Sequence, residues 1–293
     1  MDNKNLTPSL IKETVVLYNH FHYGDIFYAR FLINLLKDKF NINFHHQLKP
    51  NLLCDIENVT EINNIPQEFS LHYTSLNTKL INTWIGSENN IYLNKVYDGC
   101  CLENYVNLCK KITDYYGINF DHNNYENLLP TVNFNLLQDV VIISNILDDF
   151  LKKYKKIVLI SNGNVKSGQS INFDFTDIIN HIASSYKEIL FLVTEQINTN
   201  HDNVISTSSI TKKQPDLLEI SYISTKCDVI IGRASGPYTY SLVKENLLNP
   251  NKKFISFNHL YHEGKFYNNQ KSTYIWSNDY SYENIINTIK SNI

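Results

Sequence analysis

The chain has 293 residues, of which 43% are hydrophobic, and its formal net charge is −3 at pH 7. This composition excludes intrinsic disorder, and the length favours two domains with packed cores. The balance of charges gives no sign of a basic nucleic-acid-binding surface, so we expect no nucleic-acid partner.

The N-terminus and the apolar runs predict the compartment. The first residues, MDNKNLTPSLIKE, lack the apolar core of a signal peptide, and no run approaches the ~20 apolar residues of a membrane helix. We therefore expect a cytoplasmic protein without a transmembrane segment. The five cysteines show no CxxC spacing, so we expect neither a disulfide framework nor a metal site: Cys54, Cys100, Cys101, Cys109 and Cys227.

The first half of the chain alternates between strand and helix patterns. A strand at 13–19 precedes a segment in which Ile26, Ala29 and Ile33 recur at helical spacing. Further strands are predicted at 42–48, 54–59, 70–76 and 79–86, and a helix at 102–117. Gly117 is a natural stop for that helix.

The second half repeats this alternation after a candidate linker at 119–135. The expected helices cover 136–154, 175–186, 217–227, a segment opening at Gly236, and 282–292. The expected strands cover 156–161, 188–194, 203–208, 228–232 and 253–258. Such alternation implies parallel sheets, so we predict an α/β fold with two Rossmann-like α/β/α domains. The domains are expected at 1–130 and 131–280. A C-terminal helix is expected at 281–293, and it could pack back on the first domain.

The segment CDVIIGRASGPYTYSL (227–242) has the features of an anion-binding turn. A buried strand reaches Gly232, Ser235 is a plausible N-cap, and Pro237 suits the first turn of a helix. A helix N-terminus at the carboxyl end of a parallel strand favours phosphate, and Arg233 is placed to clamp a diphosphate. A capped turn without a ligand remains the alternative.

A second polar loop, SNGNVKSGQS (161–170), also follows a buried strand. Its glycines, serines and Lys166 are typical of a backbone nest for anions, although a plain surface connector fits as well. The GxxxxGK(S/T) pattern of a P-loop is absent. The sequence also lacks a GxGxxG fingerprint, which weighs against a dinucleotide-binding enzyme. Two such loops in one domain favour a shared ligand.

These motifs resemble a known family. CDVIIGRASGPYTYSL looks like the DLVIGNDSGPMHLA segment of the heptosyltransferases that build lipopolysaccharide cores, and GDIFYARFLINLL (24–36) looks like their N-terminal GDVLHTLPAL segment. The resemblance implies the GT-B architecture, in which two Rossmann-like domains face across a cleft and the sugar nucleotide lies mainly on the second. Two departures are Ala234, where that family has Asp, and Thr239, where it has His.

The resemblance implies an enzyme that transfers a sugar from a nucleotide-diphosphate sugar to a glycan or other acceptor, inverting and independent of metal. Asp25 would be the general base, because such a transfer needs a carboxylate beside the acceptor hydroxyl. As an alternative, Asp25 is an N-terminal cap of its own helix. No cofactor beyond the donor substrate is expected, and a catalytically degenerate nucleotide-sugar-binding protein is the alternative function.

The candidate site residues fall into two groups. Those expected on the donor side are Asn162, Gly163, Lys166, Ser167, Gly168, Gln169, Arg233, Ser235, Gly236, Pro237, Tyr238 and Thr239. Those expected on the acceptor side are His20, His22, Tyr23 and Trp84. For the aromatic residues, ordinary packing in the core is the alternative.

Overall fold

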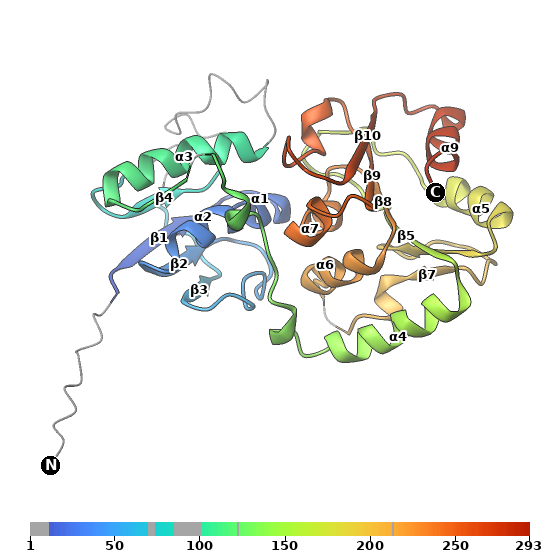
Figure 1. The fold of residues 1–293 in the computed structure, drawn as a ribbon, viewed down its shortest axis with the longest axis horizontal. Coiled ribbons are helices and arrows are strands. Elements are labelled where there is room, and N and C mark those ends of the chain that lie inside the picture. Colours follow the sequence, from blue (N-terminus) through green and yellow to red (C-terminus); the bar gives the residue numbers. More distant parts are fainter. Residues whose placement is uncertain (1–11, 70–73, 85–100, 122, 213) are drawn as a thin grey trace, which may run out of the picture.

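The computed structural model describes the chain apart from residues 1–11, 70–73, 85–100, 122 and 213, and it contains two parallel sheets in two units (Figure 1). The expected strands at 70–76 and 79–86 therefore fall partly outside the described residues. Within 74–76, Ser75 makes an isolated antiparallel bridge to Leu80.

The first unit is a four-stranded sheet in the order β3-β2-β1-β4, with all neighbours parallel. Its elements are β1 (Thr14–Tyr18), α1 (Tyr23–Tyr28), α2 (Arg30–Leu36), β2 (Asn41–His45), β3 (Val59–Ile62), β4 (Leu80–Asn82) and α3 (Cys101–Tyr116). The prediction of a strand at 54–59 is wrong in its position. The carboxylate of Glu61 accepts hydrogen bonds from the N–H groups of Leu52 and Leu53 and so ties the preceding segment into turns.

The chain crosses between the units through two short 3-10 turns, η1 (Glu126–Leu128) and η2 (Phe134–Leu136). The second unit is a six-stranded parallel sheet in the order β10-β9-β8-β5-β6-β7. Its strands are β5 (Lys156–Ser161), β6 (Ile189–Val193), β7 (Val204–Ser206), β8 (Val229–Gly232), β9 (Lys253–Phe257) and β10 (Thr273–Ser277). Its helices are α4 (Val140–Lys153), α5 (Thr176–Ser185), α6 (Leu217–Lys226), α7 (Gly236–Tyr240), α8 (Lys244–Leu247) and α9 (Tyr282–Lys290), with 3-10 turns η3 (Thr207–Ser209) and η4 (Tyr261–Glu263).

The C-terminal helix α9 packs against α5 in the second unit. Ile285, Ile286 and Ile289 point into a core formed with β5, β6 and α5. The option that this helix packs back on the first unit is therefore not realised, and Figure 1 shows α9 on the side of the second unit remote from the first.

The two units share one apolar core. A single buried cluster contains residues from β1, α1 and α2 together with residues from α6, α7 and β9. Aromatic pairs cross the boundary: for example, Phe27 and Tyr240 have ring centroids 4.7 Å apart, and Tyr28 stacks on Phe266 at 5.0 Å. Burial of this apolar surface holds the units in one relative position.

Candidate functional site

In each sheet the strand that comes first in the sequence, β1 or β5, lies in the interior, and the chain adds later strands on both sides of it. The strands β2 and β4 flank β1, and the strands β6 and β8 flank β5. At such a point the following loops leave toward opposite faces, and α/β proteins bind ligands beyond these carboxyl ends. The loop after β1 contains His20 and His22, and the loops after β5 and β8 contain the predicted donor residues.

The two sequence motifs meet in space, because the first turns of α1 and α7 pack against each other. A Cβ added to Gly24 would lie 3.3 Å from Oγ1 of Thr239, and one added to Gly236 would lie 3.4 Å from Cβ of Tyr23. The two glycines allow this close approach. The Gly-Asp turn and the Ser-Gly-Pro turn are thus parts of one region.

Asp25 is the third residue of α1, whose N-cap is His22, so Asp25 does not take the N-cap position itself but bonds back to it from within the first turn, and its side chain reaches the surface. Its Oδ2 accepts a hydrogen bond from the backbone N–H of His22 at 3.1 Å, and its side chain is 24% exposed. Burial raises the pKa of this carboxyl above its ordinary value, against the lowering effect of the His22 hydrogen bond. A carboxylate with a raised pKa is the stronger proton acceptor, so the capping role leaves a general-base role open.

The residues predicted for the acceptor side have different surroundings. The Nε2 of His20 is hydrogen-bonded to the carbonyl oxygen of Phe69 at 2.9 Å, whereas the side chain of His22 is 50% exposed. Trp84 packs against Phe21, with centroids 4.1 Å apart. Tyr23 packs against Gly236 of the second unit, so it helps to form the contact between the units.

The loop between β5 and α5, residues 162–175, contains predicted donor residues and is called the donor loop below. Its first part is tied to the end of β6. The Nδ2 of Asn162 donates to the carbonyl oxygen of Glu195, and its Oδ1 accepts from the N–H of the same residue, both at 2.8 Å. A Cβ on Gly163 would lie 2.4 Å from Oε1 of Glu195, so a larger residue here would require the Glu195 side chain to move. Asn162 and Gly163 therefore shape the loop and place a carboxylate beside it.

The tip of the same loop is exposed. Lys166 is exposed, and Ser167 donates to Oε1 of Gln169 at 2.8 Å. Gly168 has φ +72°, a conformation that favours glycine. The carbonyl oxygen of Gln169 accepts from the N–H of His259, which ties the tip to the loop after β9.

The structure gives Arg233 a different role from the expected diphosphate clamp. Its side chain is fully buried, and its two terminal nitrogens donate to the carbonyl oxygens of Ile171, Phe173, Asn162 and Gly163. The guanidinium also lies over the rings of Phe173 and Phe175. This arginine holds the donor loop in shape from beneath, and it is not available to a ligand.

The turn into α7 is held by polar contacts from neighbouring strands. The hydroxyl groups of Ser235 and Ser161 are 2.7 Å apart, and Ala234 donates its N–H to Oδ1 of Asn258. Gly236 and Pro237 are half-buried at the surface of this turn. Tyr238 and Thr239 are buried, so of the predicted α7 residues these two pack inward.

A pocket of about 520 Å³ lies along the edge strand β7 and the segment that follows β6. It is lined by Val193, Gln196, Ile197, Thr199, Val204, Ile205, Ser206, Ser208 and Ser209. Because Thr194 and Glu195 are hydrogen-bonded to Asn162, the segment that lines one side of this pocket is continuous with the donor loop. A mixed apolar and hydroxyl lining suits a flat, polar-edged ligand group.

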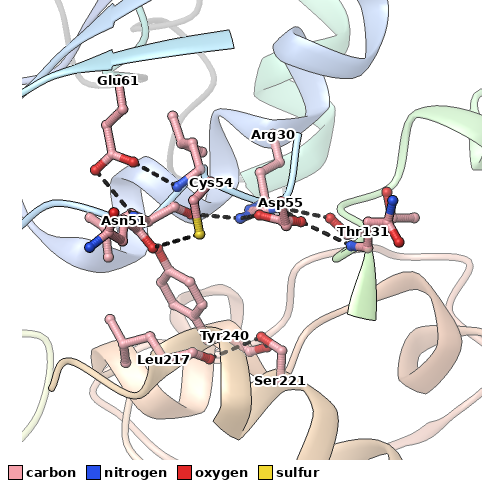
Figure 2. A network of polar contacts seen from close by, with 12 residues as sticks. Arg30, Asn51, Cys54, Asp55, Glu61, Thr131, Leu217, Ser221 and Tyr240 are labelled. Atoms are coloured by element: carbon pink, nitrogen blue, oxygen red, sulfur yellow. Dashed lines mark hydrogen bonds and ion pairs between the residues drawn. The ribbon is translucent and has the colours of Figure 1, made fainter. Parts of the chain in front are cut away.

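Sequence reasoning missed two features of this region. Glu195 follows directly after a buried strand, and that position could have drawn attention to it. The buried Arg30–Asp55 pair could not have been found, because its partners are distant in sequence. The guanidinium of Arg30 donates to both carboxylate oxygens of Asp55 and to the carbonyl oxygens of Leu52 and Thr131, as Figure 2 shows.

This pair fixes the first unit to the crossover. Asp55 also accepts from the N–H of Asn133, and its arginine neighbour holds the pKa of the carboxyl below its usual range. In Figure 2 Tyr240 of α7 reaches from the second unit toward this network. The network therefore lies under the contact that brings the two motifs together.

Comparison with known proteins supports the fold. No protein-family model and no curated protein sequence matches the chain. A glycosyl transferase family 9 structure from Veillonella parvula matches with a TM-score of 0.52 at 14% identity, over 96% of this chain and 91% of its own. This chain has the same fold. The GT-B architecture expected from the two motifs is thus confirmed, with two parallel-sheet units joined at their switch points.

Two further similar structures carry heptosyltransferase names. Escherichia coli ADP-heptose lps heptosyltransferase II matches at 11% identity over 94% of this chain and 98% of its own, with a TM-score of 0.44. The dodecameric iron-containing heptosyltransferase TibC matches at 9% identity over 92% of this chain and 63% of its own, with a TM-score of 0.49. In the part of the chain that the structure describes, no helix is long and apolar enough to cross a membrane.

Proposed function

We propose that this chain is a glycosyltransferase that transfers a hexosyl or heptosyl group from a nucleotide-diphosphate sugar to a carbohydrate acceptor in the cytoplasm, with inversion and without a metal ion. The observation that carries the proposal is the direct contact between the Gly24–Asp25 turn and the Gly236–Thr239 turn at the two switch points. The contact brings the turn that carries Asp25, a carboxyl of raised pKa, against the turn that we assign to the diphosphate.

This arrangement supports the following reaction. The acceptor hydroxyl attacks the anomeric carbon of the donor, the bond from that carbon to the diphosphate oxygen breaks, and the hydroxyl proton passes to Asp25. Charge that develops on the departing diphosphate needs donors held ready for it. Lys166 and the amides around Gly236 are the groups that we assign to this task.

The nucleoside part of the donor would extend along the same edge of the sheet. The pocket along β7 has room for a nucleobase, and it is continuous with the loop that carries Lys166. The carboxylate of Glu195 lies between them, against Gly163, where it can accept hydrogen bonds from ribose hydroxyl groups.

A panel of nucleotide-diphosphate sugars and acceptors tests this proposal, with hydrolysis and transfer both measured. Asp25→Asn is the informative variant, because an amide oxygen can still accept the His22 N–H bond but cannot take up a proton. Loss of transfer with donor binding retained supports the proposed mechanism. Full transfer by this variant removes Asp25 from it.

One observation favours a second candidate, a protein that binds nucleotide sugars without turnover. The buried guanidinium of Arg233 donates its hydrogen bonds to the donor loop. Lys166 is then the cationic side chain of that loop that can offset the charge of a leaving diphosphate, which is less than the two cations expected from the sequence. Donor binding without hydrolysis or transfer on any acceptor of the panel would support this candidate.

A further inference from the structure

An aromatic surface lies beside Asp25 at the carboxyl ends of β1 and β4. It consists of Phe21, His22 and Trp84. The rings of Phe21 and Trp84 lie 4.1 Å apart at 32°, and Phe21 and His22 lie 6.4 Å apart. His22 in turn donates its N–H to Asp25. Ring contacts and one hydrogen bond thus connect Trp84, Phe21 and His22 in turn to the proposed base.

The backbone under this surface is fixed in place. The Nδ2 of Asn19 donates to Oγ1 of Thr83 at 2.9 Å, which joins the loop after β1 to the loop after β4. The Oδ1 of the same asparagine accepts from the N–H of Phe21 at 2.9 Å. A surface held in this way is ready for a ligand before binding, which lowers the ordering cost of recognition.

The first-unit loops at this edge of the sheet offer little positive charge. The described loops after β1, β3 and β4, residues 19–22, 63–69 and 83–84, carry Glu68 and neither Lys nor Arg. The longer loop after β2 contributes Lys49. Arg30, the nearest arginine along the chain, is fully buried and paired with Asp55, so its charge is not offered to a ligand at the surface.

We infer that the acceptor is an uncharged saccharide whose ring packs on the Phe21–Trp84 pair and presents a hydroxyl group to Asp25. This inference rests on the proposed transferase function and adds the class of the acceptor. A sugar ring has an apolar C–H face that loses water favourably against an aromatic ring. A phosphorylated or carboxylated sugar would place a second negative charge near Asp25, where the described loops after β1, β3 and β4 carry no Lys or Arg and Lys166 is already assigned to the donor diphosphate.

Fluorescence at one tryptophan tests this inference without any need for turnover. The chain has two tryptophans, so the Trp276→Phe protein keeps Trp84 as its single tryptophan. Neutral methyl glycosides and neutral oligosaccharides should change its emission saturably. Matched uronic acids and sugar phosphates should bind at least about tenfold more weakly. Because the neutral contact is not ionic, it should be insensitive to added salt.

Variants at position 84 separate stacking from folding. In the otherwise native chain, Trp84→Ala should raise the acceptor KM by about tenfold with little change in kcat, and Trp84→Phe should restore most of this loss because it keeps an aromatic face. Trp276→Phe is the matched control and should leave the acceptor KM unchanged. If Trp84→Ala does not fold, the fluorescence ranking of neutral over charged sugars decides alone.

Three results would overturn the inference: tighter binding of the charged sugars, no saturable response to any saccharide, or unchanged acceptor binding in a folded Trp84→Ala protein. Calorimetric titration with nucleotide-diphosphate sugars is run in parallel. Donor binding with any of these three results refutes only the acceptor class. Absence of donor binding refutes the proposed function itself.

Discussion

The side chain of Asp25 combines a structural and a chemical role. Its Oδ2 closes the first turn of α1, while a quarter of the side chain remains open to solvent. The same burial that raises its pKa makes it a better proton acceptor at the pH where it is still ionised. The two roles respond differently to pH and to substitution.

The pH dependence of transfer should report this carboxyl. The base must be deprotonated, so kcat/KM should rise with pH through a pKa above the ordinary aspartate value and then level off. For stability the sign is opposite: because the pKa of Asp25 is raised in the folded state, its ionisation costs stability as pH rises through that pKa. A pH–rate profile with no inflection above the ordinary aspartate range would contradict the assignment.

Asp25→Asn should lower transfer by about 10²–10⁴-fold, the usual contribution of a positioned base, without lowering the melting temperature at pH 7. The amide keeps the hydrogen bond to His22 and removes the cost of a half-buried charge. Asp148→Asn, on the exposed face of α4, is the matched control and should retain full transfer. A melting temperature that falls along with activity would point to the capping role alone.

Lys166 carries the electrostatic part of donor binding in this account. Lys166→Gln should raise the donor KM by about tenfold, and Lys166→Arg should keep most of the affinity because it keeps the charge. Lys153→Gln, an equally exposed substitution on α4, serves as the control. Equal donor KM for all three variants would show that the loop tip does not meet the phosphates.

At the scale of elements, the donor loop owes its shape to Arg233. Four backbone carbonyl groups of the loop accept hydrogen bonds from its fully buried guanidinium. We predict that Arg233→Met destabilises the fold by about 3 kcal/mol, because buried carbonyl oxygens would lose their donors. Urea unfolding gives the number. A folded variant of native stability with weaker donor affinity would instead restore the diphosphate-clamp role.

The sequence predicted the elements whose pattern is local. Gly117 ends α3 with φ +60°, as its position suggested, and the buried strands β5, β6 and β8 lie close to their predicted places. The edge strand β10 was missed because it pairs only with β9 and none of its residues is fully buried, so its sequence lacks the apolar run of a central strand. The helix expected from Gly236 onward is split into α7 and α8, since Val243 adopts an extended conformation between them.

The candidate site was predictable only in part, for a physical reason. Glycines and capping residues indicate turns, so both motifs could be recognised from the sequence. The direction of a long side chain depends on which loop passes over it. Arg233 could point at a ligand or at its own loop with the same local sequence, and the structure shows the second.

At the scale of the whole molecule, the two units behave as one body. One apolar cluster and aromatic pairs cross their boundary, and the Arg30–Asp55 pair fixes the crossover beneath it. Thermal and urea unfolding should therefore each show a single transition. Two transitions, or different midpoints from probes in the two units, would mean that the boundary is weaker than the packing indicates.

Tyr240 is the residue that tests this boundary. Its ring is fully buried against Phe27, and its hydroxyl has no hydrogen-bond partner among the described residues. Tyr240→Ala should destabilise the whole chain by about 3–5 kcal/mol, whereas Tyr240→Phe, which removes only the unpaired hydroxyl, should be neutral or stabilising. Equal losses from both variants would show that the hydroxyl has a partner in solution.

Removal of metal ions tests whether the proposed transfer needs a cation to offset the charge of the diphosphate. In the described part of the chain no group of three His, Cys, Asp or Glu residues could hold a metal ion together. We predict that transfer is unchanged after treatment with EDTA and dialysis. Activity that is lost with the chelator and returns with a divalent cation would contradict a mechanism in which side chains and amides alone offset the diphosphate charge.

Hydrogen exchange with and without a saturating nucleotide-diphosphate sugar tests the central claim, that the donor lies between the loop at 162–170 and the turn at 234–239, next to Asp25. We predict slower exchange in those two segments and at the start of α1, and no change in α4 or β10. Protection confined to other segments, with these three unaffected in a protein that binds the donor, would contradict the account.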